Sequence, residues 1–316
     1  MQQRNLGNSG LKVSLVGLGC NNFGGDRCDF EASRKVIHKA LDLGITLIDT
    51  ADTYGNRGDS ERILGDCLGG RRQDVVLATK CGLPMDAAGN LKGASRRYIM
   101  SAIDSSLKRL KTDWIDLYII HRPDPQTPIE ETLRTLDDLV RAGKVRYTGC
   151  STFAAWQVVE AQWAAKYHNL NHFMTCQDQY NLLARGIEKD LEPVMQSYGL
   201  GLIPHTPLAA GLLSGKYQRN EPMPAGARMT REKRQAERWL NNANWEVVER
   251  LSALCKARGH TLLELAMSWL ASRPLVASII AGATSPEQLE LNARAVEWRL
   301  GAEDLAAIDK ATLRGR

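Results

Sequence analysis

The segment 47–54 reads LIDTADTY, which ends an apolar run at Asp49 and places Tyr54 five residues later. Two later apolar runs also close on a single ionisable residue: VVLATK ends at Lys80, and LYIIH ends at His121. Short apolar runs of this kind are typical of buried strands, and the carboxyl ends of parallel strands meet on one side of the fold. The pattern therefore predicts that these four polar side chains form one proton-transfer cluster at one end of a barrel.

Outward from this segment, the chain repeats a unit of a short apolar run followed by a longer stretch with helical spacing. This alternation is typical of strand-helix units in a parallel sheet. There are eight such runs, at 15–19, 46–49, 75–80, 115–121, 145–151, 173–177, 200–205 and 276–281. Eight units predict an α/β fold, a closed (β/α)8 TIM barrel with its active site at the carboxyl ends of the strands.

Three segments supplement this pattern. Residues 4–14 hold Asn8-Ser9-Gly10 between two semi-apolar runs, which predicts a hairpin that plugs the other end of the barrel. The stretch Thr127-Pro128-Ile129-Glu130 has the pattern of a capping box, and Gly143 is expected to stop that helix. The charged stretch 214–242, rich in Pro and Gly, is expected to be a lid or a disordered loop.

Bulk composition narrows the class of protein. With 316 residues, 43% of them hydrophobic, residues 1–316 are expected to form a single barrel domain. Lys and Arg exceed Asp and Glu by only five, 41 against 36, with no basic tail for nucleic acid. Seven cysteines without Cys-x-x-Cys spacing suggest a reducing compartment. No apolar run approaches the ~20 residues of a membrane helix, so we expect a cytoplasmic protein.

The polar residues at the strand ends suit carbonyl chemistry. Tyr54 can donate a proton if Lys80 lowers its pKa, and Asp49 can hold the ammonium in place. His121 can orient a carbonyl oxygen or relay a proton. Each residue alone is more often a cap, a solvated group or a packing residue. Their delivery to one rim by consecutive strand-helix units favours the cluster.

The chain resembles the aldo-keto reductase family over nearly its whole length. The similar segments, in the family's order, are GNSGLKVSLVGLGCNNFG, LIDTADTYGNRGDSERILG, ATKCG, LYIIHRPD, QYNLLAR, TPLAAGLLSGKY and GATSPEQLELN. The resemblance implies NAD(P)H-dependent reduction of a small aldehyde or ketone, with Asp49, Tyr54, Lys80 and His121 as its catalytic tetrad. A cofactor-binding, redox-sensing regulatory subunit, like the potassium-channel β subunits, is the alternative; we expect it less, because such a subunit would carry an amino-terminal extension. A metal-dependent barrel hydrolase ranks last.

The cofactor site is not a Rossmann fingerprint, because Asn22 stands where the last glycine belongs after Gly17 and Gly19. A capping box at 285–288 instead predicts free backbone N–H groups for an anion. The resemblance implies that cofactor contacts come from Asp49, Ser151, Thr152, Gln177, His205, Thr206, Pro207, Leu208, Lys216, Arg228, Gly282, Thr284, Gln288 and Asn292. Ser151 and Gln177 would hold the nicotinamide carboxamide, and Arg228 would meet the 2′-phosphate of NADP(H).

Four positions depart from the family pattern. Thr152 replaces an asparagine, His205 replaces an aromatic ring, and Gly282 and Gln288 stand where a lysine and an arginine can bind the 2′-phosphate, so NAD(H) stays possible. His168 and His172 lack the acid of a zinc motif, and no metal is expected. The substrate and the oligomeric state cannot be read from the sequence. Candidate pocket residues are Phe23, Pro84, Met85, Arg122, Phe153 and Trp239.

Overall fold

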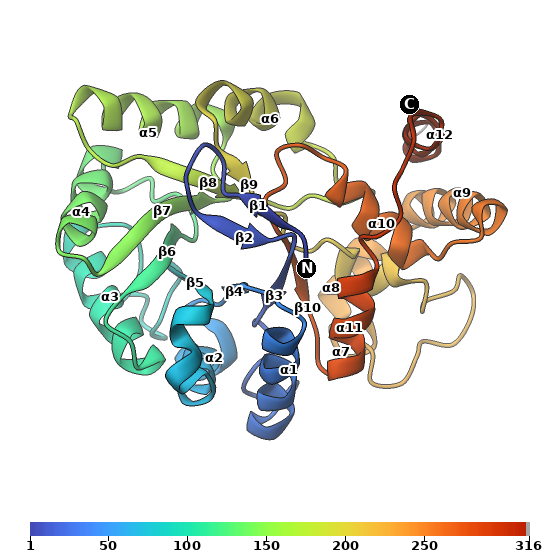
Figure 1. Cartoon of the computed structure of the whole chain (residues 1–316), viewed down its shortest axis with the longest axis horizontal. Coiled ribbons are helices and arrows are strands. Elements are labelled where there is room, and N and C mark those ends of the chain that lie inside the picture. The colour runs from blue at the N-terminus through green and yellow to red at the C-terminus, as the bar shows by residue number, and fades with distance from the viewer. Residues whose placement is uncertain (314–316) are drawn as a thin grey trace.

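The computed structural model describes residues 1–313, and in them an eight-stranded parallel sheet curls into a barrel (Figure 1). Its strand order is β10-β3-β4-β5-β6-β7-β8-β9. The Ala277 amide donates to the Leu202 carbonyl at 2.9 Å and the Ile280 amide donates to the Pro204 carbonyl at 3.2 Å, which closes the barrel between its outer strands. The strands are β3 (Val16–Gly19), β4 (Leu47–Asp49), β5 (Val76–Cys81), β6 (Ile115–Ile120), β7 (Val145–Ser151), β8 (Phe173–Gln177), β9 (Gly201–Leu202) and β10 (Ile279–Gly282).

Helices follow the strands and surround them, as Figure 1 shows for α1 to α6. The first six are α1 (Phe30–Asp42), α2 (Tyr54–Leu68), α3 (Arg96–Leu110), α4 (Ile129–Arg141), α5 (Ala155–Tyr167) and α6 (Ile187–Tyr198). The later ones are α7 (Arg228–Arg231), α8 (Lys233–Trp239), α9 (Asn242–Arg258), α10 (Leu262–Ala271), α11 (Pro286–Arg294) and α12 (Ala302–Thr312). Two 3-10 helices, η1 (Gly69–Asp74) and η2 (Ala209–Ser214), complete the elements of residues 1–313. This arrangement confirms the predicted (β/α)8 fold.

The amino-terminal hairpin closes one end of the barrel, as the sequence predicted. Its strands β1 (Gln3–Asn5) and β2 (Lys12–Ser14) pair antiparallel. Leu6 and Val13 are fully buried and pack into the apolar cluster inside the barrel with Leu47 and Leu117, which lie early in their strands. In Figure 1 the hairpin lies across the end of the barrel that faces the viewer. The carboxyl ends of the strands, and with them the predicted tetrad, lie at the opposite end.

One local prediction needs correction, and another becomes more definite. The hydroxyl of Thr127 donates to Asp124 Oδ2 at 2.8 Å and does not cap α4, so Pro128 becomes the N-cap and the predicted capping box is wrong. The helix ends near Gly143 as expected, with that glycine in the left-handed region at φ 74°. The stretch 214–242 is not a structureless loop, because it contains the short helices α7 and α8.

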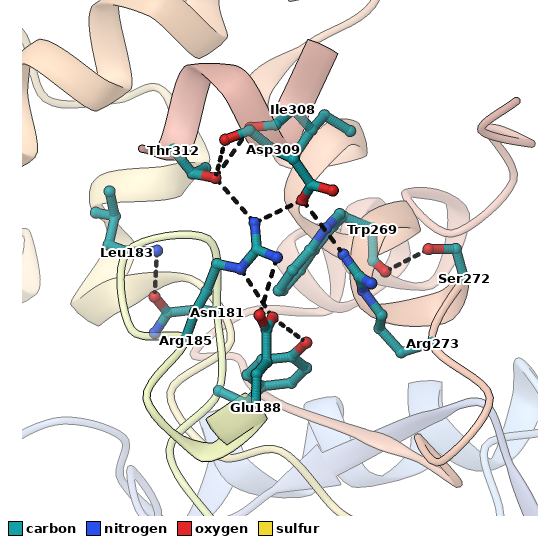
Figure 2. Close-up of polar contacts among 11 residues, drawn as sticks. Asn181, Leu183, Arg185, Glu188, Trp269, Ser272, Arg273, Ile308, Asp309 and Thr312 are labelled. Atoms are coloured by element: carbon teal, nitrogen blue, oxygen red, sulfur yellow. Dashed lines mark hydrogen bonds and ion pairs between the residues drawn. The ribbon is translucent and has the colours of Figure 1, made fainter. Parts of the chain in front are cut away.

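The carboxy-terminal helix α12 is held by an arginine from another part of the chain (Figure 2). Arg185, which follows the loop after β8, donates to Asp309 Oδ1 at 2.7 Å and to Thr312 Oγ1 at 2.9 Å. The same guanidinium makes two bonds to the Glu188 carboxylate, at 2.8 and 2.9 Å. Paired bonds of this kind fix both the position and the orientation of an arginine. The last helix is thereby tied to the segment that follows β8.

Candidate active site

Asp49, Tyr54 and Lys80 form one hydrogen-bonded group at the carboxyl ends of β4 and β5. Lys80 Nζ donates to Asp49 Oδ2 at 2.7 Å, to the Thr50 carbonyl at 2.8 Å and to Tyr54 Oη at 3.3 Å. Lys80 is fully buried and Asp49 nearly so. A buried ammonium persists only when its donors are satisfied, and here all three have acceptors. The arrangement holds a positive charge against the phenol oxygen.

The pKa values of this group keep Lys80 charged and Tyr54 protonated. Burial lowers the pKa of Lys80, but Asp49 and Tyr54 together outweigh it, and the pKa ends above its usual value. Burial raises the pKa of Tyr54 more than the Lys80 ammonium lowers it, so that pKa is also raised. The expectation of a net lowering of the Tyr54 pKa is wrong. A phenol that keeps its proton at neutral pH is a proton donor and not a base.

His121 lies directly beyond the end of β6 and packs its ring edge-on against Tyr54, with ring centroids 5.8 Å apart. Burial lowers the pKa of His121 to about 2, and the charges of Lys80 and Arg122 add to this effect. The imidazole is therefore neutral at physiological pH. Its Nδ1 atom is buried and has no hydrogen-bond partner within residues 1–313. A neutral ring beside the phenol can orient a carbonyl oxygen without competing for the proton.

A glycine fixes how Tyr54 enters its helix. Gly55 has φ 59°, a left-handed conformation that side chains other than asparagine rarely adopt. A Cβ atom there would lie 2.2 Å from the Phe23 carbonyl oxygen. The chain can thus bring Tyr54 close against the segment after β3 only with glycine at this position. The Tyr-Gly pair in the sequence is a geometric requirement of the site.

A cavity of about 690 Å³ opens beside the tetrad, within the size range of small-molecule sites. Lys80 lies beneath its floor, and the other predicted catalytic residues line it. So do all the predicted cofactor residues, namely Asp49, Ser151, Thr152, Gln177, His205, Thr206, Pro207, Leu208, Lys216, Arg228, Gly282, Thr284, Gln288 and Asn292. Of the sequence's further pocket candidates, only Arg122 belongs to its lining. Seven of the eight apolar runs of the sequence thus contribute residues to one space.

Ser151 and Gln177, predicted to hold the nicotinamide carboxamide, differ in their hydrogen bonds within the structure. Gln177 Nε2 donates to Asp49 Oδ1 at 2.8 Å, so its amide N–H supports the tetrad. Ser151 hydroxyl makes no hydrogen bond within residues 1–313 and borders the cavity. Thr152 has φ 58° and turns its hydroxyl to the Ser151 carbonyl at 2.7 Å. Threonine is strained in this conformation, whereas asparagine tolerates it, which gives a backbone reason for asparagine in the family pattern.

His205 is uncharged at neutral pH. Burial lowers its pKa to about 4, with Lys80 and Arg238 adding to the effect. Its Nδ1 lies 3.0 Å from Thr206 Oγ1, and the Thr206 carbonyl accepts from Asn181 Nδ2 at 2.9 Å. The loop after β9 is thus held by the loop after β8. An uncharged ring therefore stands on the cavity wall where the family pattern has an aromatic side chain.

A cluster of cations lines the far end of the cavity. Glu232 pairs with Arg27 at 2.6 Å and with Arg228 at 3.3 Å, which joins the segment after β3 to helix α7. Lys216 has a pKa lowered by burial and by Arg228. Arg27 and Arg231 were missed by the sequence reasoning, since nothing in their local pattern distinguishes them from surface arginines.

The start of α11 is less open to an anion than the sequence suggested. Ser285 Oγ accepts from the Gln288 amide at 3.3 Å. Gln288 Oε1 in turn accepts from the Thr284 amide at 3.0 Å and its hydroxyl at 3.1 Å. The amides of Thr284 and Gln288 therefore already donate hydrogen bonds and are not free for an anion. The Gln288 side chain reaches Thr284, one residue before the N-cap Ser285, so the predicted reciprocal capping box does not form. The charge needed for phosphates is supplied mainly by the cation cluster.

The chemistry of the lining fits a nicotinamide dinucleotide. Asp49 is the sole acidic residue among the lining residues of this cavity within residues 1–313, and it is paired with Lys80. The cationic lining residues are Arg27, Arg122, Lys216, Arg228 and Arg231. An excess of fixed positive charge attracts phosphates, and neutral rings at the other end suit a nicotinamide.

Other classes of site receive no support from the described chain. Across residues 1–313, no three His, Cys, Asp or Glu side chains gather so that they could bind a metal ion. His168 lies 3.0 Å from an Arg134 nitrogen through its Nδ1 atom. Among the helices of the described part, none has the length and apolar character needed to span a membrane.

Known proteins are similar in sequence to nearly the whole of this chain. The model of the aldo/keto reductase family covers residues 15–312. A probable voltage-gated potassium channel subunit beta of Arabidopsis thaliana is 38% identical, over 94% of this chain and 92% of that protein. An L-glyceraldehyde 3-phosphate reductase of Escherichia coli is 35% identical, over 98% and 92%. A versiconal hemiacetal acetate reductase of Aspergillus parasiticus is 32% identical, over 98% and 96%.

Proposed function

This chain belongs to the aldo/keto reductase family, and we propose that it is an enzyme that uses NADP(H) to reduce a small aldehyde or ketone to the alcohol. The family generally uses nicotinamide cofactors. The observation that carries the proposal is the 3.3 Å contact between Lys80 Nζ and Tyr54 Oη beside a cation-lined cavity. This contact supports Tyr54 as the acid, because a protonated phenol beside an ammonium can donate a hydrogen bond to a carbonyl oxygen in the cavity.

The reduced nicotinamide, when bound, supplies the hydride that forms the new C–H bond. Tyr54 Oη gives its proton to the carbonyl oxygen as the carbon–oxygen π bond breaks, and solvent returns a proton to the phenol. Lys80 stabilises the phenolate that forms briefly, while Asp49 and Gln177 keep the ammonium in place. His121 orients the carbonyl oxygen as a neutral ring. Electrostatic groups fixed before the reaction need no reorganisation during it.

Cofactor preference follows from the same cavity. Arg27, Arg228 and Arg231 with Lys216 form the cationic end, where the pyrophosphate and a 2′-phosphate would bind. Ser151, with its unengaged hydroxyl, and His205, as a neutral ring, would receive the nicotinamide. The cationic end supports NADP(H) over NAD(H), even though Gly282 and Gln288 carry no charge.

A regulatory subunit with little turnover is the second candidate, because a curated relative at 38% identity is named a potassium channel subunit. The reductase names of other relatives favour catalysis. Purified protein titrated with NADPH and with NADH, followed by nicotinamide fluorescence, tests the cofactor. NADPH oxidation in the presence of a panel of aldehydes tests the reaction. Tight binding without oxidation of any aldehyde would support the regulatory subunit, and no binding of either nucleotide would refute both candidates.

A further inference from the structure

The cations of the cavity fall into two groups. Arg27 lies close enough to Arg228 and Arg231 for their charges to lower its pKa, so these three form one group at the cationic end of the cavity. Arg122 instead acts on His121 and His205, whose pKa values it lowers. Arg122 is therefore a cation at the end of the cavity that holds Tyr54 and His121.

Arg122 has no counter-charge in the described chain. Arg122 lines the cavity, and its guanidinium makes no hydrogen bond, ion pair or ring contact with residues 1–313. The carboxylate of Asp124, the nearest acid along the chain, accepts hydrogen bonds from the Ala94 and Gln126 amides and the Thr127 hydroxyl. Arg238, the other cation beside His205, donates to Gln179 Oε1 at 2.5 Å. Arg122 is thus a cation without a partner beside the reacting groups.

The cofactor does not account for this charge. The phosphates of a nicotinamide dinucleotide match the cationic end of the cavity, and its reduced nicotinamide ring is neutral. The tetrad does not account for it either, because Asp49 already pairs with Lys80 and accepts from Gln177. A planar guanidinium with free N–H groups recognises carboxylate and phosphate by paired hydrogen bonds.

We propose that the substrate is an anionic carbonyl compound, whose carboxylate or phosphate binds Arg122 while its carbonyl lies between Tyr54 and His121. The inference rests on the proposed reductase function and narrows its substrate class. Arg122 directly follows His121 in the chain and lines the same cavity, so one small substrate can contact both residues. Arg122 is then a residue that determines specificity, and it takes no part in proton or hydride transfer.

The test compares substrates that differ only in charge. Para-carboxybenzaldehyde against para-carbamoylbenzaldehyde probes the carboxylate, and glycolaldehyde phosphate against glycolaldehyde probes the phosphate. The kcat/KM ratio of each pair is measured for wild type, Arg122→Gln and Arg122→Lys. Arg97→Gln is the matched control, because Arg97 is an exposed arginine on α3 outside the cavity lining.

The wild type should prefer at least one anionic partner, and Arg122→Gln should reduce that ratio by about tenfold. Tenfold corresponds to the low end of a charged hydrogen bond, which is appropriate because Arg122 is exposed to solvent. Arg122→Lys should restore part of the preference, and Arg97→Gln should leave it unchanged. Added salt should weaken the preference in the wild type. The pair that responds identifies carboxylate or phosphate as the recognised group.

No anionic preference in the wild type, or the same preference in Arg122→Gln, would overturn the proposal. Turnover of the neutral aldehydes reports the reductase function separately, so the two ideas can fail independently. If no aldehyde is reduced, calorimetry of terephthalate against terephthalamide, with NADP⁺ present, still measures anion binding. Equal affinities of wild type and Arg122→Gln for terephthalate would then count against Arg122.

Discussion

Replacing Tyr54 with phenylalanine removes the proposed acid and retains the ring. The edge-on contact with His121, at 5.8 Å between centroids, involves the ring and is preserved. Lys80 loses one of its three acceptors and keeps Asp49 and the Thr50 carbonyl, at 2.7 and 2.8 Å. The lost bond should lower the free energy of unfolding by about 1 kcal/mol, so the variant should fold.

The chemical loss is expected to be much larger. General acid catalysis contributes about 10² to 10⁴ in rate, so turnover should fall by about a hundredfold or more. The other nearby titratable groups do not replace the phenol, because His121 is neutral and Lys80 is held by Asp49. Cofactor affinity should stay nearly intact, since the hydroxyl contacts Lys80 and does not belong to the cation cluster proposed for the phosphates.

The assay is single-turnover NADPH oxidation, with deuterated cofactor used to establish that hydride transfer limits the rate. Tyr147→Phe is the control, because Tyr147 packs in the apolar cluster at the other end of the same barrel. It should keep wild-type turnover. If Tyr54→Phe retained more than about a third of the wild-type rate under these conditions, Tyr54 could not be supplying the factor of about 10² expected of an acid.

Four further outcomes are expected. Lys80→Met should lose more turnover than Asp49→Asn, because methionine removes the positive charge that lowers the pKa of Tyr54 against the effect of burial. Equal losses with identical pH profiles would contradict these roles. The rate of reduction by the wild type should vary little between about pH 6 and about pH 9, because the pKa of Tyr54 lies above its usual ~10 and His121 and His205 are neutral in that range. A midpoint of the pH profile near neutrality would assign the proton to another group. Arg228→Ala should weaken NADPH by about ten- to a hundredfold and leave NADH almost unchanged in paired titrations, whereas parallel losses would place Arg228 on the pyrophosphate. Thr152→Asn should raise the free energy of unfolding by about 1 kcal/mol in denaturant titrations, because asparagine suits the left-handed backbone, and a decrease would show that the threonine hydroxyl matters more.

The sequence predicted the barrel and the place of the tetrad because both follow from periodicity. A strand that is apolar throughout and polar at its end places that residue on the rim, whatever the rest of the chain does. Asp49, Lys80 and His121 were found in this way. Tyr54 was found by its distance from the strand end, and Gly55 explains why the following turn is possible. Local pattern was sufficient for these positions.

Contacts between segments far apart in the chain could not be predicted in the same way. Arg27 and Glu232 carry no signal that they meet, because an ion pair across a cavity depends on where two loops are placed. The sign of the Tyr54 shift also escaped prediction. It depends on the balance between burial and the Lys80 charge, and burial is a property of the folded chain.

A second set of buried ionisable side chains packs next to the tetrad. The sequence pattern did not predict this set either. Glu61 is fully buried and accepts from Thr79 Oγ1 and from Arg109 Nε, each at 2.6 Å. Asp52 accepts from Tyr98 Oη at 3.2 Å, and its own amide donates to the Lys80 carbonyl at 3.1 Å. Thr79 precedes Lys80 on β5, and Asp52 lies in the loop that leads to Tyr54.

These bonds connect β5, which carries Lys80, and the loop that leads to Tyr54 with one buried frame of side chains, namely Asp52, Glu61, Thr79, Tyr98 and Arg109. Burial raises the pKa of Asp52 to about 7, and the neighbouring Glu61 adds to the shift, so one carboxyl can stay protonated while Arg109 neutralises the other. A frame held this way needs no net buried charge. The strand ends therefore carry the groups that we propose for the chemistry, and the buried side chains beneath them support the 3.3 Å contact between Lys80 and Tyr54.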